Sequence, residues 1–397
     1  MTGQKIANLK IAADRFVDTI LTNDEHHRVS ISIVPYNAQV NIGPDLVSKF
    51  NITDHNNVAN VNCVEIPVAA YATGPLSLTA PMPMMAYADI AHTTSRVDSY
   101  VSETGSSAVP NYSNTYCKPT TVNMIRLPNN DAATLKSQID ALQAGGNTSI
   151  TLGMKWGLTM IDPAMRPVYA DFADAGKIPS TMPGRPFEYA DPDTTKIIVL
   201  MTDGEHVSHN RINDGYKTGP SPIYRSTGDG RYSVHHTTGR PAAAGTNEYY
   251  VPHLGSATTA AAWRATPWNS GGGVVQQNWE TIWANLRMPY VAWQFYGRAL
   301  GTNSAGRDAK YNAMVTAFQS TFAEVDAMDA QLQTSCDQAK AQGVTVYGVT
   351  VEAPEHGQQV ISACSTSTSH YFEATAANID EKFASIAANI TQLRLTQ

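Results

Sequence analysis

The sequence predicts an open, mostly parallel α/β sheet with helices on both faces and two large insertions. Helix and strand patterns alternate from one end of the chain to the other, which is typical of this class. The run TKIIVLM at residues 195–201 is almost continuously apolar and suits a parallel strand buried on both faces. Residues 52–118 and 206–305 interrupt the pattern, and we interpret them as insertions into one domain spanning residues 1–397.

The core of this domain is expected in residues 1–50, 120–205 and 325–397. Apolar residues spaced by three and four positions predict helices, and short apolar or alternating runs predict strands. The expected helices cover residues 6–20, 135–142, 149–161, 307–342, 358–363 and 379–393. The expected strands cover residues 29–34, 122–127, 195–201, 344–351 and 370–373. The second insertion begins as loops and is expected to become helical and aromatic over residues 279–300.

Composition narrows the class of protein. The chain has 397 residues, of which 42% are hydrophobic, enough to form a core. Its formal charge is −7 and its basic residues form no local cluster, so we expect no nucleic-acid partner. Only 15% of the residues are charged, against about 25% in an average soluble domain. A surface made of Thr, Ser, Asn and Tyr favours an envelope or secreted protein over a cytosolic enzyme.

Neither a signal peptide nor a membrane-spanning segment is expected within this sequence. The first ten residues, MTGQKIANLK, lack the apolar stretch of a signal peptide. The most apolar stretch, residues 58–91, is interrupted by Glu65 and by four prolines, which prevent a continuous helix.

The four cysteines are Cys63, Cys117, Cys336 and Cys364. An even number allows two disulfides in any of three connectivities, and four buried thiols in a reducing compartment remain an alternative. The absence of a C-x-x-C spacing disfavours a zinc ribbon or a thioredoxin-type site.

Motifs of common enzymes are absent. The sequence has no G-x-S-x-G, no Walker phosphate loop and no H-E-x-x-H, and no G-x-G-x-x-G follows a strand. His206 and His209 are interpreted as ordinary surface histidines, as are His235 and His236, because no third ligand or nucleophile is placed near them by spacing. We therefore expect a protein that is not an enzyme.

Tryptophans cluster in the second insertion. One interpretation is a platform for carbohydrate or a partner, and the other is packing of the insertion on itself, which the helical spacing of Trp279 and Trp283 favours. The cluster comprises Trp263, Trp268, Trp279, Trp283 and Trp293.

A turn at the end of the most apolar strand is the best candidate site. Asp203 follows this strand directly, and ligands of open α/β sheets bind beyond the carboxyl ends of the strands. Thr148 precedes a predicted helix and offers a hydroxyl to the same place. Carboxylate and hydroxyl oxygens suit Mg²⁺, which retains several waters and leaves a position for an acidic group of a partner. The alternative is that Asp203 is simply a turn residue before Gly204.

Several segments, in their order along the chain, resemble a von Willebrand factor type A (vWA) domain. More narrowly, they resemble the carboxyl-terminal domain of TadG-like proteins of tight-adherence (Tad, or Flp) pilus systems. The segments are KIANLKIAADRFVD, VSISIVPYNAQVNIG, GGNTSITLGMKWGL, IVLMTDGE, AKAQGVTVYGVTVE, HYFEA and FASIAANITQLRL. The resemblance implies a Rossmann-like open sheet, and the two insertions lie outside it.

In this family, three loops form a metal-ion-dependent adhesion site (MIDAS). The first carries Asp-x-Ser-x-Ser, the second a Thr that corresponds to Thr148, and the third an Asp that corresponds to Asp203. Residues 1–5 match the family's segment directly after the first loop, so the resemblance implies that the ligands of that loop would lie upstream of Met1. The site is then incomplete, and Mg²⁺ would bind this chain weakly or not at all.

The family's first strand would be missing for the same reason. That strand lies in the centre of the sheet, between the strands expected at 29–34 and 196–201. Unpaired buried backbone groups cost about 1–3 kcal/mol each, so its loss would be expensive. We therefore hypothesise that Met1 is an internal methionine of a longer parent protein, which supplies the strand, the loop and an N-terminal membrane anchor.

The resemblance also bears on the cysteines and the compartment. It implies a Cys336–Cys364 disulfide, which leaves Cys63 and Cys117 to close the first insertion. Disulfides require an oxidising compartment, and the parent protein is expected in the cell envelope, periplasmic or at the cell surface.

The function implied by the resemblance is a TadG-like binding and assembly module of pilus biogenesis or surface attachment. Its partner would be a protein that offers an acidic side chain, such as a pilus or envelope component. The alternative is a secreted vWA adhesin that binds carbohydrate or a host protein. An enzyme and an intracellular vWA domain that works with an AAA-type ATPase are both disfavoured.

Overall fold

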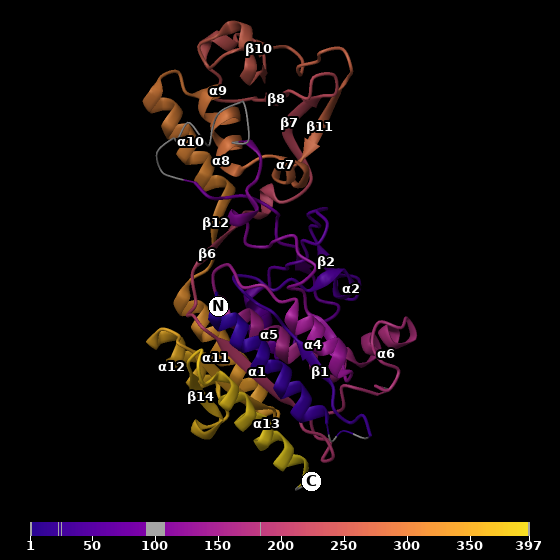
Figure 1. Cartoon of the computed structure of the whole chain (residues 1–397). Helices are drawn as coiled ribbons and strands as arrows, with labels where there is room; N and C mark the ends of the chain where they lie inside the picture. Colours follow the sequence, from indigo (N-terminus) through magenta and orange to yellow (C-terminus); the bar gives the residue numbers. More distant parts are fainter. Residues whose placement is uncertain (1, 23, 25, 93–107, 183, 396–397) are drawn as a thin grey trace.

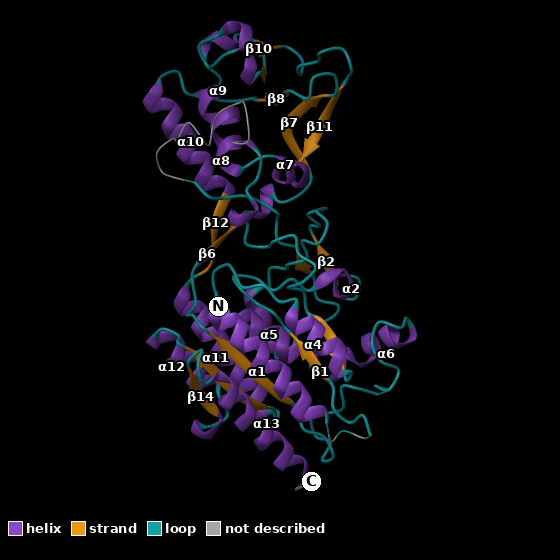
Figure 2. Cartoon of the chain, viewed as in Figure 1, coloured by secondary structure: helices purple, strands orange, loops and turns teal. Residues whose placement is uncertain are grey.

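The chain forms an α/β body that contains both chain ends and a second lobe built from the middle of the sequence (Figure 1). The computed structural model describes residues 2–22, 24, 26–92, 108–182 and 184–395. Helices surround the strands of the body, whereas the second lobe combines short strands, helices and long loops (Figure 2). None of the helices in these ranges is both long and apolar enough to cross a membrane.

A three-stranded parallel sheet lies at the centre of the body. Its order is β14 (Tyr371–Ala374), β13 (Thr345–Val351) and β5 (Ile197–Thr202). β5 pairs with β13 along its whole length. The apolar run predicted as a strand buried on both faces is therefore an edge strand of this sheet, with β13 as its partner.

A separate pair of strands belongs to the same body. β1 (Ile31–Ile33) and β4 (Arg126–Asn129) are antiparallel. β4 lies a few residues beyond the strand expected at 122–127. Among the described residues, no strand joins this pair to the three-stranded sheet.

Helices cover both faces of the parallel sheet. α1 (Gln4–Leu21) and α13 (Ile379–Leu395) pack on one face, against side chains such as Val349. The helices of the other face are α5 (Ile150–Met160), α11 (Val325–Ala341) and α12 (Glu355–Cys364). Ile198 and Leu200 point to this second face, whereas Val199 and Met201 point to the first, because side chains alternate along a strand. α4 (Ala132–Asp140) packs beside α1 through Leu135 and Val17.

The two disulfides join the cysteines in the pairs that the resemblance implies. Cys336 of α11 is bonded to Cys364 of α12, and both side chains are buried. Cys63 is bonded to Cys117 within the first insertion, with Cα atoms 5.8 Å apart. The described part of the chain has no free cysteine.

The first insertion is largely irregular and forms a layer between the body and the second lobe. Its regular elements are β2 (Ile52–Thr53), the 3-10 helix η1 (Val68–Thr73), β3 (Met82–Pro83) and the 3-10 helix η3 (Tyr112–Asn114), and the short helix α2 (Gly43–Val47) precedes it. Tyr71 and Met84 pack with Trp156 of α5 in one apolar cluster, so this insertion is anchored on the body.

The chain enters and leaves the second lobe through an antiparallel ribbon of β6 (His209–Ile212) and β12 (Gln319–Ala323). The lobe contains a five-stranded antiparallel sheet in the order β10-β9-β8-β7-β11. Its strands are β7 (Pro220–Ser226), β8 (Tyr232–His235), β9 (Tyr249–Tyr250), β10 (Trp263–Arg264) and β11 (Val274–Asn278).

The sequence-based prediction of one helix over residues 307–342 is wrong. α10 (Ser304–Phe318) and α11 are separated by β12, because residues 319–323 pair with β6. The helix expected over 279–300 is also interrupted. The chain there forms α7 (Trp279–Asn285), α8 (Met288–Val291), a π-helical turn (Ala292–Gly297) and α9 (Arg298–Leu300).

The tryptophans of the second lobe form its core. Trp279 and Trp283 are stacked with ring centroids 5.2 Å apart. Trp263 and Trp293 are also buried. Trp268 is half-buried, and its indole N–H donates to Asp229 at 2.9 Å. The insertion therefore packs on itself, as the spacing of Trp279 and Trp283 favoured.

Candidate functional site

The loops that contain Thr148 and Asp203 meet at the carboxyl edge of the parallel sheet. Thr148 lies two residues before α5, and Asp203 directly follows β5. The main-chain N–H of Val207 donates to the carbonyl oxygen of Thr148 at 3.0 Å. A Cβ atom built on Gly204 would lie only 2.8 Å from Thr148 Oγ1. Both residues line the same cavity.

Local hydrogen bonds and close packing shape the Asp203 turn. The N–H of Gly204 donates to Thr202 Oγ1 at 3.1 Å, which closes the turn directly after the strand. A side chain at Gly357, near the start of α12, would collide with the carbonyl group of Gly204. Glycine at both positions therefore allows α12 to approach the turn that carries Asp203.

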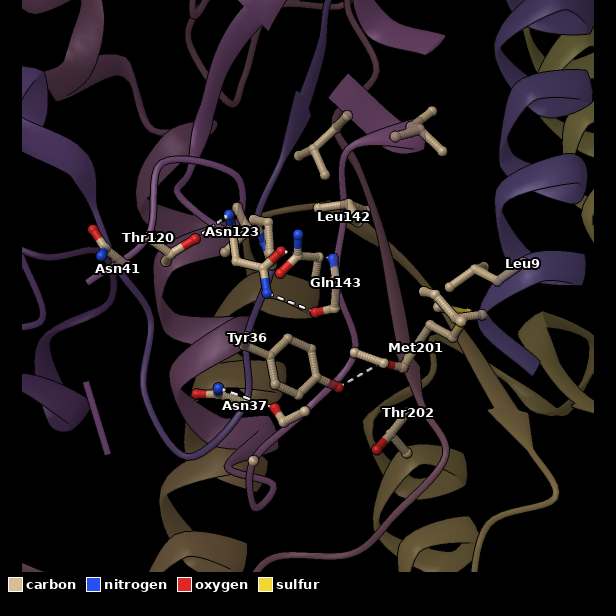
Figure 3. A pocket seen from close by; sticks show the side chains of 18 of the residues that line it. Leu9, Tyr36, Asn37, Asn41, Thr120, Asn123, Leu142, Gln143, Met201 and Thr202 are labelled. Carbon is tan, nitrogen blue, oxygen red and sulfur yellow. Dashed lines mark hydrogen bonds between the residues drawn. The ribbon is translucent and has the colours of Figure 1, made fainter. Parts of the chain in front are cut away.

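The cavity extends from this edge down between β1 and β5 and has a volume of about 840 Å³. Figure 3 shows Tyr36 and Asn37 from the segment after β1 beside Met201 and Thr202 of β5. Tyr36 Oη donates to the carbonyl oxygen of Met201 at 2.5 Å. Burial, and to a lesser degree the charge of Asp203, raise the pKa of Tyr36, so its hydroxyl remains a donor.

Further polar groups line the upper part of the cavity. The side chain of Gln39 is almost completely buried, and its Nε2 lies 2.8 Å from His209 Nε2. Its Oε1 has no hydrogen-bond partner among the described residues. Asn37 and Asn147 line the same cavity. Tyr36, Gln39 and these amides carry no sequence motif, because only the close approach of β1 to β5 brings them to the site.

The interpretation of His206 as a surface residue is wrong. Its ring is buried, and its Nε2 accepts a hydrogen bond from the main-chain N–H of Thr151 at 3.0 Å. Its Nδ1 therefore carries the proton and donates to Asp329 at 2.7 Å. His356 Nε2 donates to the other oxygen of the same carboxylate at 2.7 Å. This network connects the loop after β5 to α5, α11 and α12.

Two other histidines are also buried, contrary to expectation. His209 packs between Tyr116 and Phe322, with ring centroids 5.2 and 5.3 Å away. His236 Nε2 donates to the carbonyl oxygen of Phe295 at 2.8 Å. Burial lowers the pKa of His236 to about 4 and lowers the pKa values of His209 and His206. These three rings are neutral at pH 7, and each packs against or hydrogen-bonds to neighbouring residues of the fold.

Thr148 and Asp203 form the rim of the cavity at the carboxyl edge of the sheet. Their oxygen atoms suit a hard cation. Asp203 supplies a carboxylate and Thr148 a hydroxyl, and both are ligand types that Mg²⁺ prefers. Among the described residues, no group of three or more His, Cys, Asp or Glu side chains is arranged to hold a metal ion. Two oxygens from the chain form only part of an octahedral shell, and water would supply the rest. Met1, before which the resemblance placed the remaining ligands, lies outside the described residues.

No family model and no curated protein matches this sequence. One solved structure is similar, the vWF domain of the type V pili tip protein Mfa5 from Porphyromonas gingivalis. The two chains share 13% identity over 98% of this chain and 90% of that one, with a TM-score of 0.36. A TM-score this low does not define a shared fold.

Proposed function

We propose that this chain is a binding and assembly module of the vWA type, and that it binds partners rather than catalysing a reaction. The single observation that carries the proposal is the meeting of Thr148 and Asp203 at the carboxyl edge of a parallel sheet. This edge is where ligands bind in open α/β folds.

The arrangement of the strands supports the vWA assignment. A single strand placed between β5 and β1 would complete one sheet in the order β14-β13-β5-X-β1-β4, with β4 as an antiparallel edge. The helices that cover both faces, α1 and α13 on one and α5, α11 and α12 on the other, also agree with it. The position between β5 and β1 is the one where the sequence resemblance places the family's first strand.

The proposed ligand of the rim is a divalent cation together with an acidic side chain of a partner protein. A carboxylate oxygen of the partner would coordinate the bound Mg²⁺. Asp203 and Thr148 would hold the cation from the strand end and from the start of α5. The Gly204 turn keeps the two groups close, since any side chain there would displace the Thr148 hydroxyl.

The setting we propose is the cell envelope, where the module would serve pilus biogenesis or surface attachment as TadG-like proteins do. The two disulfides support this setting, because such bonds persist in oxidising compartments outside the cytosol. The burial of four tryptophans makes an aromatic carbohydrate platform in the second lobe a weaker alternative.

Calorimetric titration of the full chain with Mg²⁺ tests the cation site. We expect a dissociation constant on the order of 1 mM, the weak end of protein sites, because the chain supplies few ligands. Asp203→Asn is expected to abolish the binding. Glu205→Gln is the matched control, since this carboxylate lies two residues further along and contacts His356 instead. Binding that survives in Asp203→Asn, or disappears in Glu205→Gln alone, would contradict the proposal.

A further inference from the structure

The strand β11 is an outer strand of the five-stranded sheet in the second lobe, where it lies beside β7 (Figure 1). Among the described residues, no strand pairs with its other edge. Its sequence, VVQQN, contains neither a charge nor a proline. The side chain of Val275 is 52% exposed, and Gln276 and Asn278 are exposed as well. β11 therefore presents an uncharged edge to solvent.

The pairing with β7 shows which main-chain groups of β11 point to this open edge. The N–H of Thr227 donates to the carbonyl oxygen of Gly273 at 3.0 Å, and Val275 continues the same register two residues later. Because main-chain groups alternate along an antiparallel strand, those of Gly273 and Val275 face β7, whereas those of Val274 and Gln276 face away. Within the described part of the chain, no hydrogen bond satisfies the N–H or carbonyl groups of these last two residues.

Other outer strands of the two larger sheets are protected against pairing with another chain. β10, at the opposite end of the five-stranded sheet, has only two residues, and one of them is Arg264. β14 of the parallel sheet carries Glu373. Short strands and charged side chains are common means of protecting an edge, and β11 has neither. The register of β11 and β7 shifts only beyond Gln276, so the first three residues of β11 form a regular edge.

The lobe around this edge is positively charged, although the whole chain has a formal charge of −7. Residues 209–323, from β6 to β12, contain ten Lys and Arg residues but only five Asp and Glu residues. Arg225 of β7 lies directly opposite Val275 and is exposed. Its guanidinium lies 5.7 Å from the ring centroid of Tyr232, and it forms no ion pair with any carboxylate of the described residues. This charge favours acidic side chains on a strand added to β11.

We propose that β11 binds an extended acidic segment of a partner polypeptide, which adds one strand to the sheet of the second lobe. In such strand addition, main-chain hydrogen bonds supply affinity and alternate side chains supply specificity. A second copy of this chain fits less well, because pairing of two β11 edges would bring two positively charged lobes together. The inference does not require the cation site, so either can fail without the other.

The test uses the full chain in EDTA, which keeps the cation site empty, and a synthetic peptide of alternating glutamate and valine residues. At saturation we expect this peptide to slow hydrogen exchange of the Gln276 main-chain N–H by about tenfold or more, as measured by nuclear magnetic resonance, because that group gains an acceptor. A peptide with the same side chains and methylated main-chain nitrogens should have no effect. Equal slowing by both peptides, or no slowing by either at millimolar concentration, would overturn the proposal.

A peptide with lysine in place of each glutamate tests the charge of the partner. We expect it to bind about tenfold more weakly than the glutamate peptide at low ionic strength, because the lobe is positively charged. The difference should shrink as salt is added. Equal binding of the two peptides at low ionic strength would contradict an acidic partner.

Val274→Pro and Val68→Pro are matched variants. Val274 is the first residue of β11 and its N–H points away from β7, so proline is compatible with the strand but removes a donor from the open edge. Val68 is 74% exposed and is the first residue of the 3-10 helix η1, where proline is also tolerated. We expect Val274→Pro to weaken binding of the glutamate peptide by about tenfold and Val68→Pro to leave it unchanged. Equal affinities in the two variants would contradict binding at this edge. If Val274→Pro fails to fold, the methylated peptide still decides the question on the unsubstituted chain.

Measurements without peptide separate the other possible occupants of the edge. Slow exchange of the Gln276 N–H that increases with protein concentration would identify a second copy of the chain. Slow exchange at every concentration would show that another part of the same polypeptide already covers the edge. Either result would overturn the proposal of a separate acidic partner.

Discussion

Lys217 and Glu65 form an ion pair in which both side chains are almost completely buried. Arg211 of β6 approaches the same carboxylate at 2.7 Å. Because Glu65 belongs to the first insertion and Lys217 to the second, this cluster joins the two. A buried salt bridge contributes little compared with an apolar pair, but removing Glu65 would leave the buried Lys217 ammonium with only the exposed Asp214 carboxylate, 2.9 Å away, as its charged partner. The contact between the insertions therefore depends on Glu65.

Glu65→Ala is expected to lower the free energy of unfolding by about 3–5 kcal/mol, as measured by urea denaturation. Asp45→Ala breaks an exposed ion pair with Lys177 and serves as the control, with an expected loss below about 1 kcal/mol. Similar decreases in the free energy of unfolding for the two variants would show that the buried cluster stabilises the fold no more than an exposed ion pair does.

Acid should destabilise the second lobe because the buried ring of His236 must then take up a proton. The unfolded chain binds a proton near pH 6.5, whereas burial delays protonation of the folded ring to about pH 4. The free energy of unfolding is therefore highest above pH 6.5 and falls as the pH drops through this window, by on the order of 3 kcal/mol. His206 and His209 shift in the same direction. His236→Gln retains a donor for the Phe295 carbonyl group and should flatten the pH dependence of urea denaturation, and an unchanged slope would contradict the assignment.

Removal of the disulfides should destabilise the chain by different amounts. In the chain-entropy model, the loop between Cys63 and Cys117, with a sequence separation of 54, contributes about 4 kcal/mol. The Cys336–Cys364 loop, with a separation of 28, contributes about 3.5 kcal/mol. Double serine variants of each pair, compared by urea denaturation, measure these losses. Native stability in the presence of a reductant would show that neither bond matters.

Gly204→Ala should weaken cation binding without unfolding the protein. The added methyl group would lie 2.8 Å from Thr148 Oγ1, so the hydroxyl must leave the position it holds beside the Asp203 turn. We expect a loss of affinity for Mg²⁺ of about tenfold, or 1.4 kcal/mol, measured by calorimetry. Gly215→Ala is the control, because no atom lies within 4 Å of its added methyl group. Unchanged affinity for Mg²⁺ in Gly204→Ala would show that the Thr148 hydroxyl is not a ligand of the cation.

The sequence predicted those elements whose burial follows a simple period. α1, α5, β5 and β13 have regular apolar spacing and appear close to their expected bounds. The strand β12 could not be predicted, because its extended form depends on pairing with β6, about 110 residues earlier in the chain. Phe318 and Phe322 are spaced as on a helix, and tertiary pairing overrides this local pattern.

The candidate site was predictable only in part. Asp203 and Thr148 follow from a strand end and a helix start, which sequence patterns identify. Tyr36 lies in a segment without a motif, and its hydrogen bond to Met201 spans 165 residues. The burial of His206 depends equally on distant groups, since Thr151 and Asp329 provide its partners.

The most direct test of the cation rim is anomalous diffraction from crystals of the full chain soaked in Mn²⁺, a substitute for Mg²⁺ with a strong anomalous signal. We expect one peak within coordination distance of both Thr148 Oγ1 and the Asp203 carboxylate. Manganese bound elsewhere, or no peak at a concentration well above the calorimetric dissociation constant, would contradict the assignment of this rim as a binding site.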